Sequence, residues 1–166
     1  MKRPRKKSAL FLGEGADEEM FLRCIKNNYR STNKNIIPID GHGGSPIDVV
    51  KDLIKNELFD PNGKQYILMD HDRPKEEIEL AEHEINKHPS IKVVIYSRKC
   101  FDEELLKILR PKDMKKNKSK SSQELKSILR TICKTSKDYE RLFTKKVLDQ
   151  ARKNSKWLDS IIKIFE

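Results

Sequence analysis

Four short apolar runs, each followed by a stretch of helical periodicity, dominate the first two-thirds of the chain. The runs cover residues 8–13, 35–40, 65–70 and 91–97. Apolar runs of this length between turn residues are typical of buried strands. Strands that alternate with helices form a parallel sheet with helices on both faces. The sequence therefore predicts an α/β fold.

The segments between the runs carry apolar side chains at helical spacing. Pro38 lies within the second run, and because proline cannot donate to a β-ladder, we expect that strand near an edge of the sheet. Ser45 and Pro46 form a typical helix start, with serine as the N-cap and proline at the first helical position. The expected helices cover residues 17–30, 45–58, 74–88 and 101–109.

The character of the chain changes after Arg110. Residues 111–122 are basic and serine-rich, which predicts a flexible loop. Apolar stripes return from Gln123 to Cys133 and from Asp138 to Phe165, and each stretch predicts a helix. The expected organisation is a basic N-terminal tail (1–7), an α/β domain (8–110), the basic loop (111–122) and a C-terminal helical extension (123–166).

The chain of 166 residues has 36 Lys and Arg against 26 Asp and Glu, a formal net charge of +10. An excess of this size favours a polyanionic partner, and nucleic acid is the commonest one. Cations cluster in the tail and in the loop, where we expect phosphate contacts from Lys112, Lys115, Lys116, Lys118 and Lys120.

No stretch approaches the roughly 18 apolar residues that span a bilayer. Three scattered cysteines suit the reducing cytoplasm, so we expect a cytoplasmic protein with no membrane partner.

Carboxylates follow two of the predicted strands, at the end where open parallel sheets bind ligands. Glu14 follows the first strand, and Asp70 and Asp72 follow the third. Two carboxylates this close repel each other unless a cation or a proton lies between them. Oxygen ligands with no Cys or His at ligand spacing favour Mg²⁺ or Mn²⁺ over Zn²⁺. The sequence therefore predicts a divalent-cation site made by Glu14, Asp70 and Asp72.

Other folds use acids in related patterns. A haloacid-dehalogenase phosphatase has its Asp-x-Asp after the first strand, whereas this pair follows the third. A response-regulator receiver has acids after its first and third strands, and Ser97 would suit its hydroxyl position, but no fifth strand with a lysine follows. The phosphate-loop pattern G-x-x-x-x-G-K-[ST] is absent.

Several segments together resemble Toprim domains. The run that ends in Gly-Glu14-Gly, with an acid four residues further on, is similar to the first Toprim motif. The stretch 66–73, an apolar strand followed by Asp-x-Asp-Arg, is similar to the second, and residues 41–46 resemble the glycine loop between the two. Residues 99–102, followed by two leucines, are similar to a segment of the RloB-like branch, near the OLD-type nucleases. Asp102 stands there where that branch has Glu.

The resemblance, which covers residues 8–110, implies a Toprim-like, Rossmann-like sheet and a Mg²⁺-dependent nuclease that hydrolyses DNA or RNA. Glu14, Asp70 and Asp72 are then the catalytic residues and hold Mg²⁺ or Mn²⁺, with Glu18 as a further metal ligand. Arg73 is expected to contact phosphate. The resemblance also points to anti-phage defence, with an ATPase or another subunit of a defence complex as a candidate partner.

A second class of function stays open, a non-catalytic nucleic-acid-binding module or complex subunit that keeps the fold. An inactive relative is expected to lack one of the three carboxylates, and this chain has them all. Trp157 and Phe165 are expected to pack between helices rather than to stack on bases. Cys100 is expected to be a buried core residue rather than a nucleophile.

Overall fold

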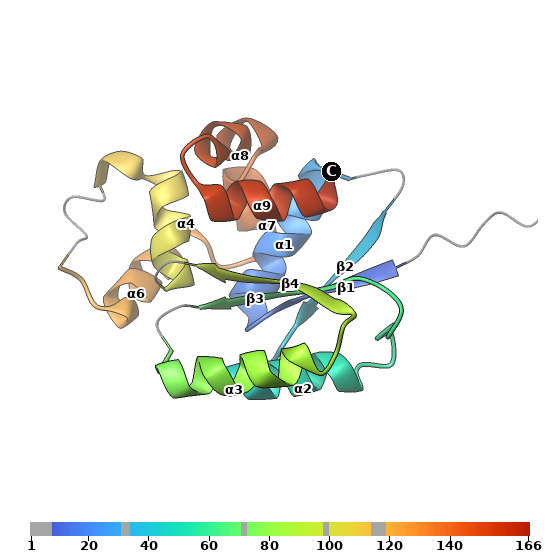
Figure 1. Ribbon diagram of the computed structural model, residues 1–166. Helices are drawn as coiled ribbons and strands as arrows, with labels where there is room; N and C mark the ends of the chain where they lie inside the picture. Colours follow the sequence, from blue (N-terminus) through green and yellow to red (C-terminus); the bar gives the residue numbers. More distant parts are fainter. Residues whose placement is uncertain (1–7, 31–33, 71–72, 98–99, 114–118) are drawn as a thin grey trace, which may run out of the picture.

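A computed structural model of the chain describes residues 8–30, 34–70, 73–97, 100–113 and 119–166 (Figure 1). One parallel sheet has the strand order β2-β1-β3-β4. Its strands are β1 (Ser8–Gly13), β2 (Asn35–Asp40), β3 (Gln65–Asp70) and β4 (Ile91–Ser97). Each strand coincides with a predicted apolar run, and β2, which contains Pro38, lies at an edge as predicted.

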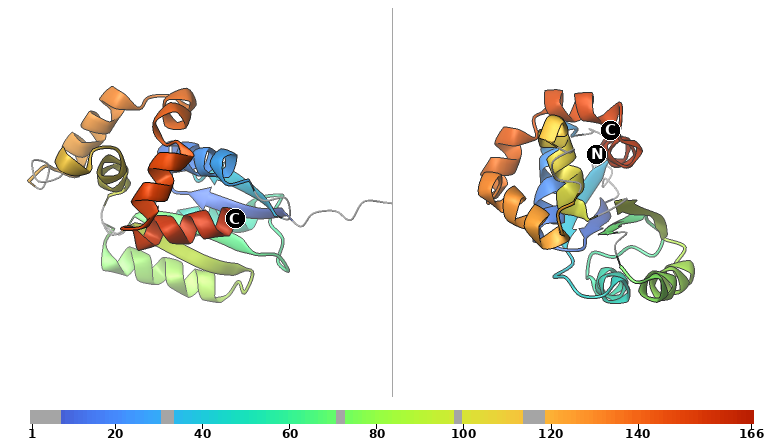
Figure 2. Two further views of the ribbon diagram at one scale, coloured as in Figure 1. Left: turned by 90° about the horizontal axis from the view of Figure 1, so that it is seen from above. Right: turned by 90° about the vertical axis from the view of Figure 1, so that its left-hand side faces the viewer.

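Helices cover both faces of the sheet, so the predicted α/β class is confirmed (Figures 1 and 2). Two of them, α2 and α3, lie on one face, and α1 with the C-terminal helices lies on the other. The helices are α1 (Ala16–Asn28), α2 (Pro46–Lys55), α3 (Lys75–Asn86), α4 (Phe101–Leu109), α6 (Ser122–Ile132), α7 (Ser136–Leu142), α8 (Lys145–Arg152) and α9 (Lys156–Phe165), with a 3-10 turn η1 (Pro111–Asp113).

Alternate side chains of β1 enter two separate hydrophobic cores, as the two-residue period of a strand requires. Leu10 and Leu12 pack with α2 and α3 in the smaller core. Phe11 faces the larger core, which α1, α4 and the C-terminal helices complete. Its ring stacks on that of Phe165 with 5.7 Å between the ring centroids. The C-terminal helices therefore share a core with the sheet.

A polar contact also fastens α9 to α4. The indole nitrogen of Trp157 donates to Glu104 over 2.7 Å, and Lys107 pairs with the same carboxylate. Trp157 and Phe165 are both buried in the core: Trp157 packs against α1 and α4 as expected, whereas Phe165 packs on β1.

The stretch from Asp138 to Phe165 was predicted as a helix, and this is wrong: it contains α7, α8 and α9. The breaks occur at Thr144 and Ser155, the N-caps of α8 and α9. The Thr144 hydroxyl accepts from the backbone of Val147 and so competes with continuous helix. The helix expected to reach residue 58 ends at Lys55.

Both ends of the predicted basic loop have regular structure. Its first three residues form η1, and α6 begins at Ser122, one residue earlier than expected. Residues 114–118, with three of the loop lysines, lie outside the described residues. None of the helices found in the described parts of the chain has the length and apolar character needed to cross a membrane.

Replacing Phe165 by alanine tests the shared core. Loss of a buried aromatic ring costs about 3–5 kcal/mol, and for a chain of this size we expect the melting temperature to fall by roughly 6–20 °C. Circular dichroism during heating measures it. Leu80→Ala, at a position in α3 that is 59% exposed, is the control and leaves the melting temperature almost unchanged. A wild-type melting curve for Phe165→Ala would contradict the packing of α9 on the sheet.

Candidate active site

The carboxyl ends of β1 and β3 meet, because the two strands are parallel neighbours in the sheet. Glu14 directly follows β1, and Asp70 is the last residue of β3. The backbone N–H of Asp70 donates to the Glu14 carboxylate over 3.3 Å. The predicted convergence of these two residues is confirmed. Asp72, the third predicted ligand, lies outside the described residues.

Glu14 is a buried carboxylate, 7% exposed, and Arg73 forms an ion pair with it. The Arg73 guanidinium also donates to the carbonyl oxygen of Gly44 over 3.1 Å. A carboxylate removed from water needs an opposite charge or hydrogen bonds, and Arg73 provides both. The sequence assigned Arg73 to phosphate; the structure places its guanidinium at the carboxylate edge.

The glycine loop after β2 holds the backbone on either side of this carboxylate. Gly41 donates to the carbonyl of Gly13 over 2.9 Å, and Gly43 donates to the carbonyl of Glu14 over 2.8 Å. A Cβ on Gly41 would lie 2.6 Å from the Gly13 oxygen, so only glycine allows this approach. Gly44 has a φ of +106°, which an L side chain rarely adopts. Sequence reasoning found this loop but missed that it fixes Glu14.

Glu18 joins the same edge from the first turn of α1. Its carboxylate accepts from the backbone N–H of Gly15 over 3.0 Å. The helix lies so close to β1 that a Cβ on Gly13 would be 2.5 Å from the Glu18 Cβ. The pKa of Glu18 is raised to about 8, chiefly by burial and in smaller part by the negative charges of Asp70 and Glu14. The structure therefore gathers three of the predicted metal ligands and leaves one of them protonated near neutral pH.

The acidic edge continues to the start of α4. Cys100 is the buried N-cap of that helix and lies within electrostatic range of Asp70. The side chain of Cys100 is buried in the larger core, as expected, and burial raises the pKa of its thiol. Asp102, in the first turn of α4, has its pKa raised chiefly by burial and also by Asp17. Its buried Oδ1 has no hydrogen-bond partner among the described residues.

The chemistry of the donors fits a hard divalent cation, because all of them are carboxylate oxygens crowded at one edge. Within the residues that the structure describes, however, no group of three His, Cys, Asp or Glu stands ready to hold a metal. Glu14 is turned to Arg73 instead. A cation at this edge therefore requires the Glu14 carboxylate to exchange Arg73 for metal, with Asp70 and Glu18 nearest to it.

The other predicted phosphate contacts are placed only in part. Lys112 is exposed in η1, and Lys120 is half-buried just before α6. Lys115, Lys116 and Lys118 lie outside the described residues, so the prediction for the loop stays a prediction.

A groove of about 950 Å³ opens elsewhere, between α4 and the helices α8 and α9. Ile108, Val147 and Trp157 line it, with Lys107 and Lys156. None of the residues at the acidic edge contributes to it. The groove and the candidate active site are therefore separate features.

The raised pKa of Glu18 predicts how stability depends on pH. Its ordinary value is 4.5, so between about pH 5 and 8 the folded chain holds a proton that the unfolded chain has released. With EDTA present, we expect the melting temperature to fall as the pH rises through this range. Glu18→Gln, which needs no proton, should flatten the dependence.

Scanning calorimetry across the pH series measures this effect. Glu79→Gln, at an exposed position of α3, is the matched control and should keep the wild-type slope. An unchanged slope in Glu18→Gln would show that another group carries the pH dependence.

Known proteins were compared with the chain in three ways. Neither the protein-family models, nor the curated proteins, nor the solved structures contain a match.

Proposed function

We propose that the protein is a Mg²⁺- or Mn²⁺-dependent phosphodiesterase of Toprim type that hydrolyses DNA or RNA. One observation carries the proposal: Glu14, Glu18 and Asp70 crowd at the carboxyl edge of two neighbouring parallel strands, with Arg73 among them. Ligands of open α/β sheets bind at this edge. The carboxylates gathered at this edge suit the binding of a divalent cation. The net charge of +10 on the chain suits a polyanionic substrate such as nucleic acid.

Glu14 and Asp70 are the residues that hold the cation in this proposal, and Asp72 joins them by its place in the sequence. A bound Mg²⁺ neutralises charge that develops on the scissile phosphate and lowers the pKa of water. Glu18 responds to the cation because its pKa lies near neutrality. A positive charge beside it would favour the ionised carboxylate, so Glu18 would then be able to hold the cation as a further oxygen ligand.

Arg73 has two roles in the proposed cycle. In the structure it neutralises Glu14 and is steadied by the Gly44 carbonyl. If a cation were held by Glu14, the Arg73 guanidinium would no longer be needed to neutralise this carboxylate and would stand beside the site. A guanidinium binds two phosphate oxygens at once, so Arg73 can then hold the substrate.

The defence role, an ATPase or other complex subunit as partner, and a cytoplasmic location are further parts of this proposal. They rest on the sequence resemblance and on the cysteine content. A nucleic-acid-binding module without catalysis is the alternative, and the following experiment separates it from the enzyme.

Asp70→Asn keeps the shape of the side chain and removes one charge from the edge. We expect cleavage to fall by about 100-fold or more, since a metal ion supplies several kcal/mol of transition-state stabilisation. Stability is retained or rises, because repulsion between carboxylates is relieved. The measurement is a cleavage time course on labelled plasmid, single-stranded DNA and RNA, with Mg²⁺, with Mn²⁺ and with EDTA.

Asp52→Asn, which makes the same change at an exposed position of α2, is the control and should cleave like the parent. Parental cleavage by Asp70→Asn would rule out the proposed site. A parent that binds nucleic acid but cleaves none of the substrates with either metal would favour the binding module.

A further inference from the structure

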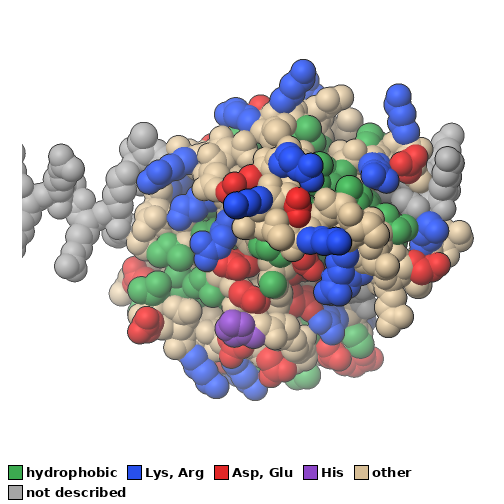
Figure 3. Space-filling model, turned by 180° about the vertical axis from the view of Figure 1, so that it is seen from behind, with side chains coloured by type: hydrophobic (Ala, Val, Ile, Leu, Met, Phe, Trp, Pro, Cys, Tyr) green, Lys and Arg blue, Asp and Glu red, His purple; other side chains and the backbone are tan. Residues whose placement is uncertain are grey.

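The two parts of the chain carry opposite net charge. Residues 8–113 contain 16 Lys and Arg against 20 Asp and Glu, whereas residues 119–166 contain 12 against 6. Figure 3 shows Lys and Arg side chains over the upper part of the molecule, the side on which α7 to α9 lie in Figure 1. A polyanion is repelled by a net negative surface. The candidate active site lies on the acidic part, so a nucleic acid needs cations from the extension to reach it.

Of the helices in the extension, α6 comes to the carboxyl edge of the sheet. It packs beside α4, at the end of the molecule to which the strand arrows point (Figures 1 and 2). Ser122, in the first turn of α6, lies close enough to Cys100, the N-cap of α4, to influence the pKa of its thiol, and the charge of Asp70 acts on the same thiol. The start of α6 therefore lies near the acidic edge.

Two cations stand on the exposed side of this helix. Lys126 and Arg130 are exposed, whereas Leu125 and Leu129 turn into the core. The four-residue spacing puts the cations on one face, about 6 Å apart along the helix axis. Both act on Asp102 at the start of α4, where their positive charges oppose the effect of burial on its pKa. We call this pair the α6 basic face.

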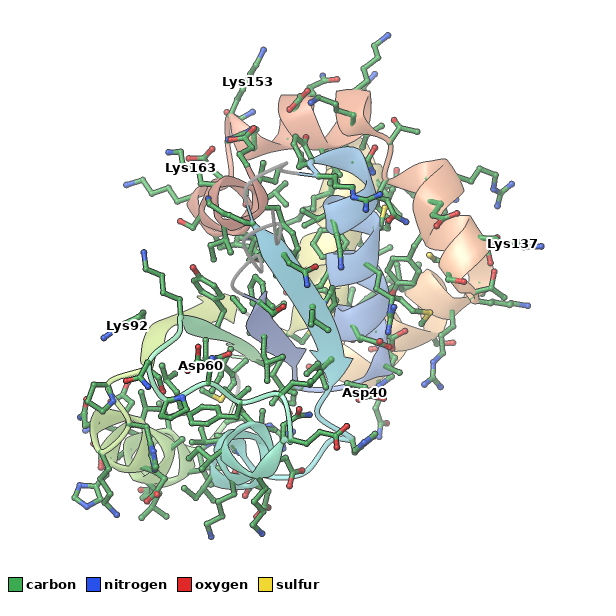
Figure 4. The ribbon with its side chains drawn as sticks, turned by 90° about the vertical axis from the view of Figure 1, so that its right-hand side faces the viewer. Asp40, Asp60, Lys92, Lys137, Lys153 and Lys163 are labelled. Atoms are coloured by element: carbon green, nitrogen blue, oxygen red, sulfur yellow. The ribbon has the colours of Figure 1, made fainter. Side chains whose placement is uncertain are left out.

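Several other cations of the extension are held in ion pairs or lie on helices other than α6. Arg152 is bound to Asp159 and Glu166, and Arg141 is paired with Asp138. Figure 4 shows Lys137, Lys153 and Lys163 projecting outward from the extension. Within the described residues, no ion pair engages Lys126 or Arg130. The α6 basic face thus lies near the acidic edge, and its two cations are not held in ion pairs with described residues.

We propose that the α6 basic face binds the phosphate backbone of DNA or RNA and guides it to the acidic edge. This inference rests on the proposed function, because it names the surface by which the substrate of that site is held. Backbone contacts of this kind carry no sequence preference. The face therefore contributes affinity and position, and leaves the choice between DNA and RNA to other contacts.

The test is the salt dependence of binding for Lys126→Gln/Arg130→Gln. The matched control is Lys51→Gln/Lys55→Gln, an exposed pair with the same spacing on α2, which covers the other face of the sheet. Fluorescence anisotropy in EDTA, which prevents metal-dependent cleavage, follows labelled duplex DNA, single-stranded DNA and RNA between about 50 and 200 mM salt.

We expect the α6 variant to flatten the slope of log K against log salt by about 1.8 for duplex DNA and about 1.4 for single strands, two contacts in each case. The control should keep the parental slope. Equal slopes for parent and α6 variant, or equal losses in both variants, would overturn the proposal. So would a parent that binds vesicles of anionic lipid and none of the nucleic acids.

Cleavage is measured separately, with Mg²⁺, on the same variants. If the parent cleaves, the α6 variant should raise KM and leave kcat nearly unchanged, because it loses binding that ground state and transition state share. If the parent binds but does not cleave, the proposed nuclease function fails while the change in slope still identifies the binding surface. A wild-type circular dichroism spectrum for both variants verifies that exposed substitutions leave the fold intact.

Discussion

The buried carboxylate of Glu14 is the interaction on which the site depends. The Arg73 guanidinium pairs with this carboxylate and the backbone N–H of Asp70 donates to it, while the N–H of Gly43 donates to the backbone carbonyl of Glu14. A charge removed from water is stable only when such partners are present together. The requirement fixes how the ends of β1 and β3 and the loop after β2 sit together. The position of Glu18 follows from the same arrangement, because the first turn of α1 packs closely against Gly13 at the end of β1.

The periodicity of the sequence was enough to predict the sheet. Alternating buried and helical stretches set the strand bounds, and the missing N–H of Pro38 placed β2 at the edge. The C-terminal stretch was harder, because its apolar stripe continues through Thr144 and Ser155, and the stripe does not show that new helices begin after these residues or that the Thr144 hydroxyl caps one of them. A capping hydroxyl competes with the helix for hydrogen bonds to backbone N–H groups, and the pattern of apolar residues does not show this competition.

The candidate site was predictable to the same degree. Glu14 and Asp70 follow neighbouring strands, so the topology alone brings them together. The pairing of Arg73 with Glu14 depends on the path of a loop and on a rotamer, and neither leaves a pattern in the sequence. The role of α6 was missed for a related reason: Lys126 and Arg130 resemble any pair on a solvated helix until α6 is seen beside α4. The C-terminal extension has a net positive charge and the α/β part has a net negative one, so the extension supplies the cations that a polyanion needs.

The central claim is that the acidic edge binds a divalent cation, and anomalous X-ray scattering from crystals soaked in Mn²⁺ tests it most directly. We expect a manganese peak between the carboxylates of Glu14 and Asp70, with the Arg73 guanidinium withdrawn from Glu14. The peak should be lost in crystals of Glu14→Gln. No peak at this edge, with Arg73 still paired to Glu14 at a Mn²⁺ concentration that labels other sites, would contradict the account.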